Sequence, residues 1–156
     1  MNELAELLIK NNISIGTVES FTVGNFATML GSIPGISKVY KGSLITYQSE
    51  TKERLLSIDH ALIEKYGVVS KEIATLMCVN GKSILDTDLC VSFTGNAGPD
   101  AMEGKPVGEV YIGIAYQDVV VYKLNLTGSR QEIASKAVEF AKKKIIEIIN
   151  ENLKKN

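Results

Sequence analysis

The sequence predicts an α/β fold: a single three-layer α/β/α domain, over residues 1–156, built on a mixed sheet. Short apolar runs of strand length alternate with segments whose apolar residues recur at helical spacing, which is typical of α/β proteins. Two late strand-like runs, 107–116 and 119–126, are separated only by Gln117-Asp118, so we expect them to pair as an antiparallel hairpin. The chain has 156 residues, 45% of them apolar, which is enough for one domain with a substantial core.

The individual elements follow from local periodicity. Helices are predicted where apolar residues recur every three or four positions, and strands where they alternate or form short runs. In chain order these are a helix at 2–11, a strand at 13–18, a helix that starts within 19–24 and ends at 31, a strand at 39–47, a helix that carries Lys52, helices at 59–66 and 70–85, a strand at 88–93, strands at 107–116 and 119–126, and a helix from 129.

Capping residues mark the boundaries of these helices. Gly31 and Gly67 stand where helices should end, because glycine readily adopts the left-handed conformation that terminates them. Ser49, Ser70 and Ser129 stand where helices should begin, and a serine hydroxyl can accept a hydrogen bond from a free N–H of the first turn. We therefore expect each of these serines to be an N-cap.

Composition disfavours several classes of function. Lysine and arginine number 17 against 18 acidic residues, a net charge of -1, which argues against binding to nucleic acid or to an anionic membrane surface. Cys78 and Cys90 lie in apolar runs without CxxC spacing, and His60 is the only histidine, so a zinc site would lack ligands. We expect two buried free thiols and no metal or other cofactor.

The N-terminal segment also bears on location. MNELAELLIK carries acidic residues where a signal peptide requires positive charge, and no apolar run in the chain approaches the roughly 20 residues that cross a bilayer. The expectation is a soluble, cytoplasmic protein.

The stretch 17–52 holds most of the groups that could perform covalent chemistry. Ser20 and Ser37 lie in predicted loops, Tyr47 ends a predicted strand, and Lys52 follows five residues later in the first turn of a helix. Burial and the positive end of the helix dipole would both lower the pKa of such a lysine. A hydroxyl beside a partly neutral lysine can attack an amide or an ester, with the tyrosine as a proton carrier.

Two loops rich in small residues are candidates for ligand binding. Residues 19–24 and 94–99 each follow a strand-like run, and the first leads into a helix. Loops at the carboxyl ends of strands present backbone N–H groups to a ligand, and the start of a helix favours negative charge. We expect a phosphate or an oxyanion at these loops.

A series of motifs in fixed order resembles the CinA C-terminal domain family, which includes the single-domain nicotinamide mononucleotide deamidases of the PncC group. The motifs are ESFTVG (19–24), PGIS (34–37), TYQSETK (46–52), YGVVSKEIA (66–74), TGNAGP (94–99), KPVGEVYIG (105–113) and TGSR (127–130). Together they span about residues 4–150. The resemblance implies a metal-independent amidohydrolase of NAD recycling that converts nicotinamide mononucleotide to nicotinic acid mononucleotide and ammonia.

The resemblance also implies roles for individual residues. Ser20, Ser37, Tyr47 and Lys52 fall on catalytic motif positions, and the two serines compete as the nucleophile. Ser37 is preferred because it lies closer in sequence to the strand that leads to Tyr47 and Lys52. The residues expected to hold the nucleotide are Thr22, Gly24, Thr94, Gly95, Gly98, Lys105 and Arg130. A homodimer is expected, since two-fold dimers are the commonest symmetric assembly.

Four positions depart from the usual family motifs. Phe21 replaces a cysteine, Val23 a glycine, Asn96 an isoleucine and Ser129 an aspartate. Val23 is the most consequential, because a β-branched residue does not easily take the positive φ that glycine allows. Two other functions therefore stay open: a binding domain of the same fold without turnover, and an amidase for another small carboxamide.

Overall fold

A five-stranded sheet forms the middle layer of the protein. In the computed structural model, which describes residues 2–156, its order is β2-β1-β3-β4-β5, parallel from β2 to β3 and antiparallel from β3 to β5. The strands are β1 (Ile15–Glu19), β2 (Tyr40–Ile45), β3 (Leu89–Gly95), β4 (Glu109–Tyr116) and β5 (Asp118–Asn125). The predicted mixed sheet and its C-terminal hairpin are confirmed.

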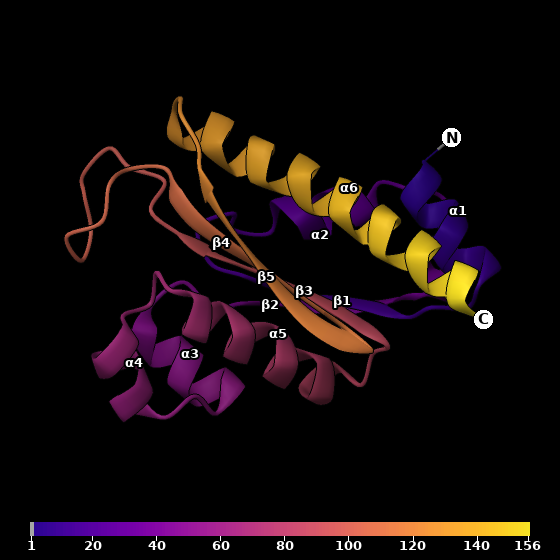
Figure 1. Cartoon of the computed structure of the whole chain (residues 1–156), viewed down its shortest axis with the longest axis horizontal. Helices are drawn as coiled ribbons and strands as arrows, with labels where there is room; N and C mark the ends of the chain where they lie inside the picture. The colour runs from indigo at the N-terminus through magenta and orange to yellow at the C-terminus, as the bar shows by residue number, and fades with distance from the viewer. Residues whose placement is uncertain (1) are drawn as a thin grey trace.

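Helices cover both faces of this sheet, as predicted (Figure 1). One layer contains α1 (Glu3–Lys10), α2 (Asn25–Gly31) and α6 (Arg130–Lys155), and the other contains α3 (Ser49–Leu56), α4 (His60–Tyr66) and α5 (Lys71–Leu85). A single turn of 3-10 helix, η1 (Ile36–Lys38), precedes β2.

The two faces of the sheet bury separate apolar clusters. Under α6, the rings of Phe26 and Phe93 lie 5.5 Å apart and pack with a stripe of buried isoleucines on that helix. Under α5, Met77 packs against Val18 and Cys90. Each fully buried side chain of this size stabilises the fold by about 1.5–3 kcal/mol, so these clusters fix the helices that flank the site.

Helix boundaries follow the predicted caps with two exceptions, Gly31 and Ser49. Gly31 is the last residue of α2 and does not take a left-handed φ, and the C-cap is Ser32 at φ -78°. Ser70 Oγ accepts from Ile73 N at 3.2 Å, and Ser129 forms a complete capping box with Glu132. Ser49 is not an N-cap: it is the first residue of α3, because the helix begins one residue earlier, with Gln48 O accepting from Lys52 N at 3.3 Å.

The two cysteines are buried and free, as expected. Burial raises the pKa of Cys78 to about 11, and it raises the pKa of Cys90 further. Both thiols therefore remain protonated and unreactive near neutral pH.

None of the helices within residues 2–156 combines the length and apolar character needed to cross a membrane.

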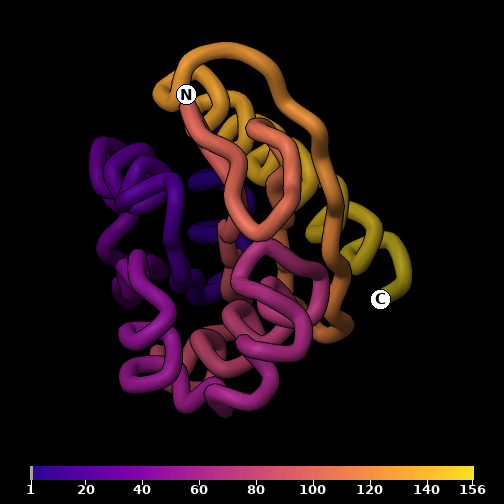
Figure 2. The backbone as a smooth tube through the Cα atoms, turned by 90° about the vertical axis from the view of Figure 1, so that its left-hand side faces the viewer, coloured from indigo at the N-terminus to yellow at the C-terminus, as the bar shows by residue number. Residues whose placement is uncertain are grey.

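The molecule has two dissimilar ends. The carboxyl ends of the three parallel strands and the loop between β3 and β4 gather at one end, which faces the viewer in Figure 2. At the other end, α1 lies beside the C-terminal half of α6 (Figure 1) and contacts η1. Ser20 and Lys52 lie at the end with the loops.

Candidate active site

Ser20 and Lys52 form a close pair at the loop end of the sheet. Lys52 Nζ donates to Ser20 Oγ at 3.1 Å and also to the carbonyl oxygens of Thr46, at 2.7 Å, and Tyr47, at 3.2 Å. Ser20 follows β1, and Lys52 lies in the first turn of α3, just after β2. Because β1 and β2 are adjacent and parallel, their carboxyl ends bring the two residues together.

The amine of Lys52 is buried from solvent, which is unusual for a lysine. Its side chain is 1% exposed, and burial lowers the pKa of Lys52 to about 8, while the negative charge of Glu103 opposes that shift. At neutral pH a useful fraction of this amine is therefore neutral and able to accept a proton. The sequence predicted that the pKa of this lysine is lowered, and in the structure the cause is desolvation by burial.

Glu19 organises the loop that carries Ser20. Its buried carboxylate accepts hydrogen bonds from the N–H groups of Phe26, at 3.1 Å, and Ala27, at 2.9 Å, and from the hydroxyls of Thr17 and Thr22. These contacts tie the end of β1 to the start of α2. The carboxylate of Glu19 thus fixes the geometry of the loop through Thr17, Thr22, Phe26 and Ala27.

Val23 takes the conformation that the family's usual glycine would provide. Its φ is 46°, it is followed by Gly24 at φ 84°, and its side chain is 58% exposed. Two successive residues with positive φ turn the chain sharply into α2. The turn therefore forms with valine, at the cost of backbone strain.

Tyr47 lies near the pair but faces a different partner. Its hydroxyl accepts from Arg130 Nη2 at 3.0 Å, and the same guanidinium donates through Nη1 to Gly98 O. Tyr47 bonds to Lys52 through its backbone carbonyl, whereas its hydroxyl bonds to Arg130.

A small cavity opens directly over Ser20. Its volume is about 100 Å³, and a second hollow of about 190 Å³ adjoins it, sharing Phe21 and Arg130 as walls. The first is lined by Ser20, Phe21, Tyr47, Gly95, Asn96, Ala97, Met102 and Arg130. A ligand could therefore place one end beside the serine and extend along α2 and α6.

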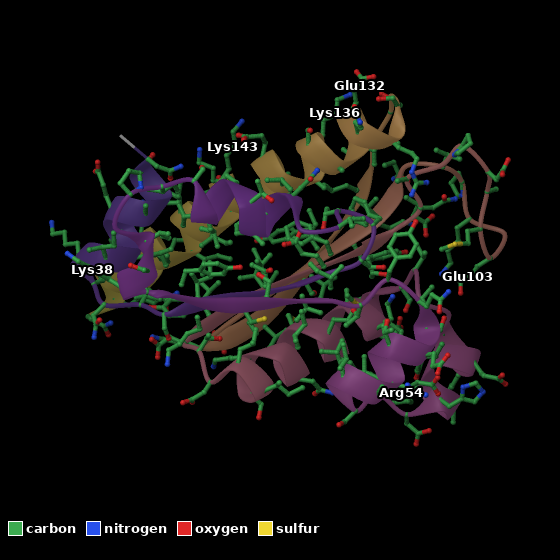
Figure 3. The ribbon with its side chains drawn as sticks, turned by 180° about the vertical axis from the view of Figure 1, so that it is seen from behind. Lys38, Arg54, Glu103, Glu132, Lys136 and Lys143 are labelled. Carbon is green, nitrogen blue, oxygen red and sulfur yellow. The ribbon has the colours of Figure 1, made fainter. Side chains whose placement is uncertain are left out.

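Ser37 is not brought to this site. It is exposed on η1, before β2, at the opposite end of the sheet from Lys52. Figure 3 shows the neighbouring Lys38 and the site loop residue Glu103 at opposite ends of the molecule. The physical reason is the strand, helix, strand crossover: with parallel strands, the residue before β2 must lie at the edge opposite to the residue after β1.

The other predicted binding residues divide into two groups. Gly95 lines the cavity, and Gly98 binds Arg130 beside it. The hydroxyls of Thr22 and Thr94 are buried and donate to Glu19 and to Val68 O, so they support the loops instead of facing a ligand.

Gly24 and Lys105 also lie outside the small cavity. Gly24 is the N-cap of α2, next to Ile45, and Lys105 Nζ donates to Val69 O.

One wall of the cavity, Met102, was not predicted from the sequence. Nothing in the polar run 100–106 marks this residue, because its position depends on how the loop folds back. The N–H groups of Phe21 and Ala97 have no hydrogen-bond acceptor within residues 2–156, and they belong to the two loops, 19–24 and 94–99, that were predicted to present backbone N–H groups.

Known sequences of one family match this chain over almost its whole length. The family model of the CinA C-terminal domain matches residues 1–149. A competence-damage inducible protein of Levilactobacillus brevis is 42% identical over 137 residues, which make up 86% of this chain and 33% of that protein. A protein of the same name from Listeria innocua is 44% identical over 108 residues, 69% of this chain and 26% of that protein. The chain thus spans a third or less of these relatives.

Solved structures share the fold. A CinA superfamily protein from Klebsiella pneumoniae superposes with a TM-score of 0.94 at 24% identity, over 96% of this chain and 95% of that one. A CinA superfamily protein from Escherichia coli superposes with a TM-score of 0.92 at 26% identity, over 94% of this chain and 87% of that one. The competence/damage inducible protein of Agrobacterium tumefaciens superposes with a TM-score of 0.88 at 27% identity, over 96% of this chain and 94% of that one.

Proposed function

The chain belongs to the CinA C-terminal domain family, and from that premise we propose that it is an amidohydrolase that converts nicotinamide mononucleotide to nicotinic acid mononucleotide and ammonia. A domain of this family fits a nucleotide-binding or an amidase role. The observation that favours the amidase is the contact of 3.1 Å between Lys52 Nζ and Ser20 Oγ in a buried setting. A surface serine and lysine would have no such reactivity.

Ser20 is the nucleophile in this proposal, and Lys52 is the base. Neutral Lys52 takes the hydroxyl proton while Ser20 Oγ bonds to the carboxamide carbon. The tetrahedral intermediate then breaks its C–N bond, and the Lys52 ammonium returns the proton to the departing nitrogen, so that ammonia leaves and an ester remains on Ser20. Lys52 then takes a proton from water, whose oxygen attacks the ester carbon. The bond between this carbon and Ser20 Oγ breaks, the Lys52 ammonium returns the proton to Oγ, and the carboxylic acid leaves.

The cavity supplies groups for the other requirements of amide hydrolysis. The free N–H groups of Phe21 and Ala97 are suitable donors for the oxyanion that develops on the carbonyl. Phe21 and Met102 offer apolar walls for a flat pyridine ring. Arg130 borders both hollows and is a suitable partner for a phosphate in the larger one.

Substitution of each serine tests the proposal. Ser20→Ala should lower the rate of ammonia release by about 10³-fold or more, since the attacking atom is removed, and it should still bind the mononucleotide in calorimetry. Ser37→Ala is the matched control and should keep wild-type turnover. Loss of turnover in Ser37→Ala alone would refute the assignment.

The same assay separates the alternative functions. A degenerate binding domain would bind the mononucleotide in calorimetry without releasing ammonia. An amidase for another carboxamide would do neither with this substrate, but would release ammonia from its own substrate in a Ser20-dependent way.

A further inference from the structure

The loop between β3 and β4 folds back over the Ser20–Lys52 pair as a tight hairpin, residues 100–106. Lys105 N donates to Met102 O at 2.9 Å, and the two residues between them, Glu103 and Gly104, have φ values of 56° and 71°. Positive φ at both central positions is the geometry of a type I′ turn. The turn sets Met102 against the cavity over Ser20, so the hairpin forms one wall of the site.

Glu103 fastens this hairpin to the linker between α4 and α5. Its two carboxylate oxygens accept from the N–H groups of Val68 and Val69, each at 3.0 Å, and Lys105 donates to Val69 O. Figure 3 shows Glu103 where the hairpin meets the layer of α3, α4 and α5. Positive φ is unfavourable for a glutamate, so these contacts must offset the strain of the turn.

Glu103 is also electrostatically coupled to the base. Its negative charge raises the pKa of Lys52, against the larger lowering by burial. The other charged residues of α3 are Glu50, Glu53 and Arg54, and α5, which contacts α3, carries Lys71, Glu72 and Lys82. The loops of the site add Glu19, Tyr47, Lys105 and Arg130.

We propose that Glu103 is a positioning residue of this site: it holds the hairpin closed over Ser20 and keeps a negative charge within electrostatic range of the Lys52 amine. The inference rests on the proposed Ser20–Lys52 chemistry, but it concerns the hairpin and not the reacting atoms. Without this carboxylate, two linker N–H groups lose their acceptors, Met102 is no longer fixed, and Lys52 holds its proton less tightly.

Glu103→Gln tests the proposal, with Asp100→Asn as the matched control, because Asp100 is an exposed carboxylate of the same loop. Hydrogen exchange of the Val68 and Val69 amides should be about 10-fold faster in Glu103→Gln than in the wild type. The NMR titration midpoint of Lys52, in protein carrying ¹³Cε-lysine, should shift to lower pH by on the order of half a unit. Asp100→Asn should change neither quantity.

Turnover provides a third readout. The rise of kcat/KM with pH should shift to lower pH in Glu103→Gln by the same amount as the Lys52 titration, which a purely structural role would not produce. If the wild type releases no ammonia from nicotinamide mononucleotide, the proposed function fails, but the exchange and titration experiments still decide the role of Glu103.

Unchanged amide exchange and an unchanged Lys52 midpoint in Glu103→Gln would overturn the inference. Should that variant fold poorly, Glu103→Asp keeps the charge and shortens the reach. In Glu103→Asp the Val68 and Val69 amides should exchange faster than in the wild type, and the Lys52 midpoint should stay near the wild-type value. If these amides exchange as slowly in Glu103→Asp as in the wild type, the inference is overturned as well.

Discussion

At the scale of single residues, Val23 shows how a local cost is tolerated beside a functional loop. A left-handed conformation costs a non-glycine residue about 1–2 kcal/mol, and Val23 adopts φ 46° with an exposed side chain that gains little from packing. The strain is confined to the turn that leads from Ser20 into α2. The turn itself is fixed by Glu19, which is why valine can occupy it.

Val23→Gly should therefore stabilise the protein. The removal of strain exceeds the extra freedom that glycine gives the unfolded chain, about 0.4–1 kcal/mol, so we expect a net gain of about 0.5 kcal/mol in the free energy of unfolding. Urea denaturation measures it. The control is Val119→Gly, another exposed valine but in the extended strand β5, where glycine should destabilise. Equal losses in both variants would contradict the strain at Val23.

The same scale shows where sequence reasoning fell short. The lowered pKa of Lys52 could be predicted, because its place in the first turn of a helix follows from local pattern. Which of Ser20 and Ser37 lies beside Lys52 depends on the end of the sheet at which each serine lies. The preference for Ser37 was based on distance along the chain, which does not indicate the end of the sheet. The parallel crossover from β1 to β2, already implied by the predicted strands and helix, contained the information that separates them.

At the scale of elements, the carboxylate of Glu19 joins a strand to a helix. The helix α2 has only seven residues and its N-cap, Gly24, offers no side chain, so Glu19 supplies the acceptors that its first N–H groups need. A short helix with such a start depends on this one group for its position. The loop that carries Ser20 depends on it as well.

Glu19→Gln should destabilise the protein by about 2 kcal/mol, because an amide NH₂ would then face a backbone N–H of α2 and leave it without an acceptor. Chemical denaturation measures the loss. Glu50→Gln removes a carboxylate whose contact is an exposed pair with Arg54, and it should change little. Should the two variants behave alike, Glu19 does not have the role assigned to it.

Element positions were largely predictable, whereas contacts between loops were not. The helices α1, α5 and α6 and the β4–β5 hairpin follow from apolar periodicity and from caps such as Ser70 and Ser129, which act within a few residues. The hydrogen bonds of Glu103 to the N–H groups of Val68 and Val69 join two loops whose residues are 35 and 34 positions apart in the sequence. No periodic pattern encodes them, so the closed hairpin could not be foreseen.

At the scale of the whole molecule, the buried amine links stability to pH. The folded pKa of Lys52, about 8, lies below the ordinary value of 10.5. Well below pH 8 the amine is protonated in both the folded and the unfolded chain, and the buried charge destabilises the fold. Between about 8 and 10.5 the unfolded chain binds more protons than the folded chain, so stability increases with pH in this window.

Lys52→Met should abolish this component. Between pH 7.5 and 9.5 Lys52 should add about 2 kcal/mol to the free energy of unfolding, an increase that the variant should lack. Urea denaturation at the two pH values gives the comparison. Lys71→Met, which removes an exposed lysine of α5, should keep the wild-type increase. Equal pH dependence in wild type and Lys52→Met would show that the amine is not desolvated.

The polarity of the molecule has a practical consequence for its handling. The first helix and the end of the last one lie together at the edge remote from the cavity. An affinity tag, a fluorophore or a surface linker can therefore be attached at the carboxyl terminus while the entrance above Ser20 stays clear. A sensor chip that captures the protein through this terminus would leave the cavity over Ser20 pointing away from the chip surface.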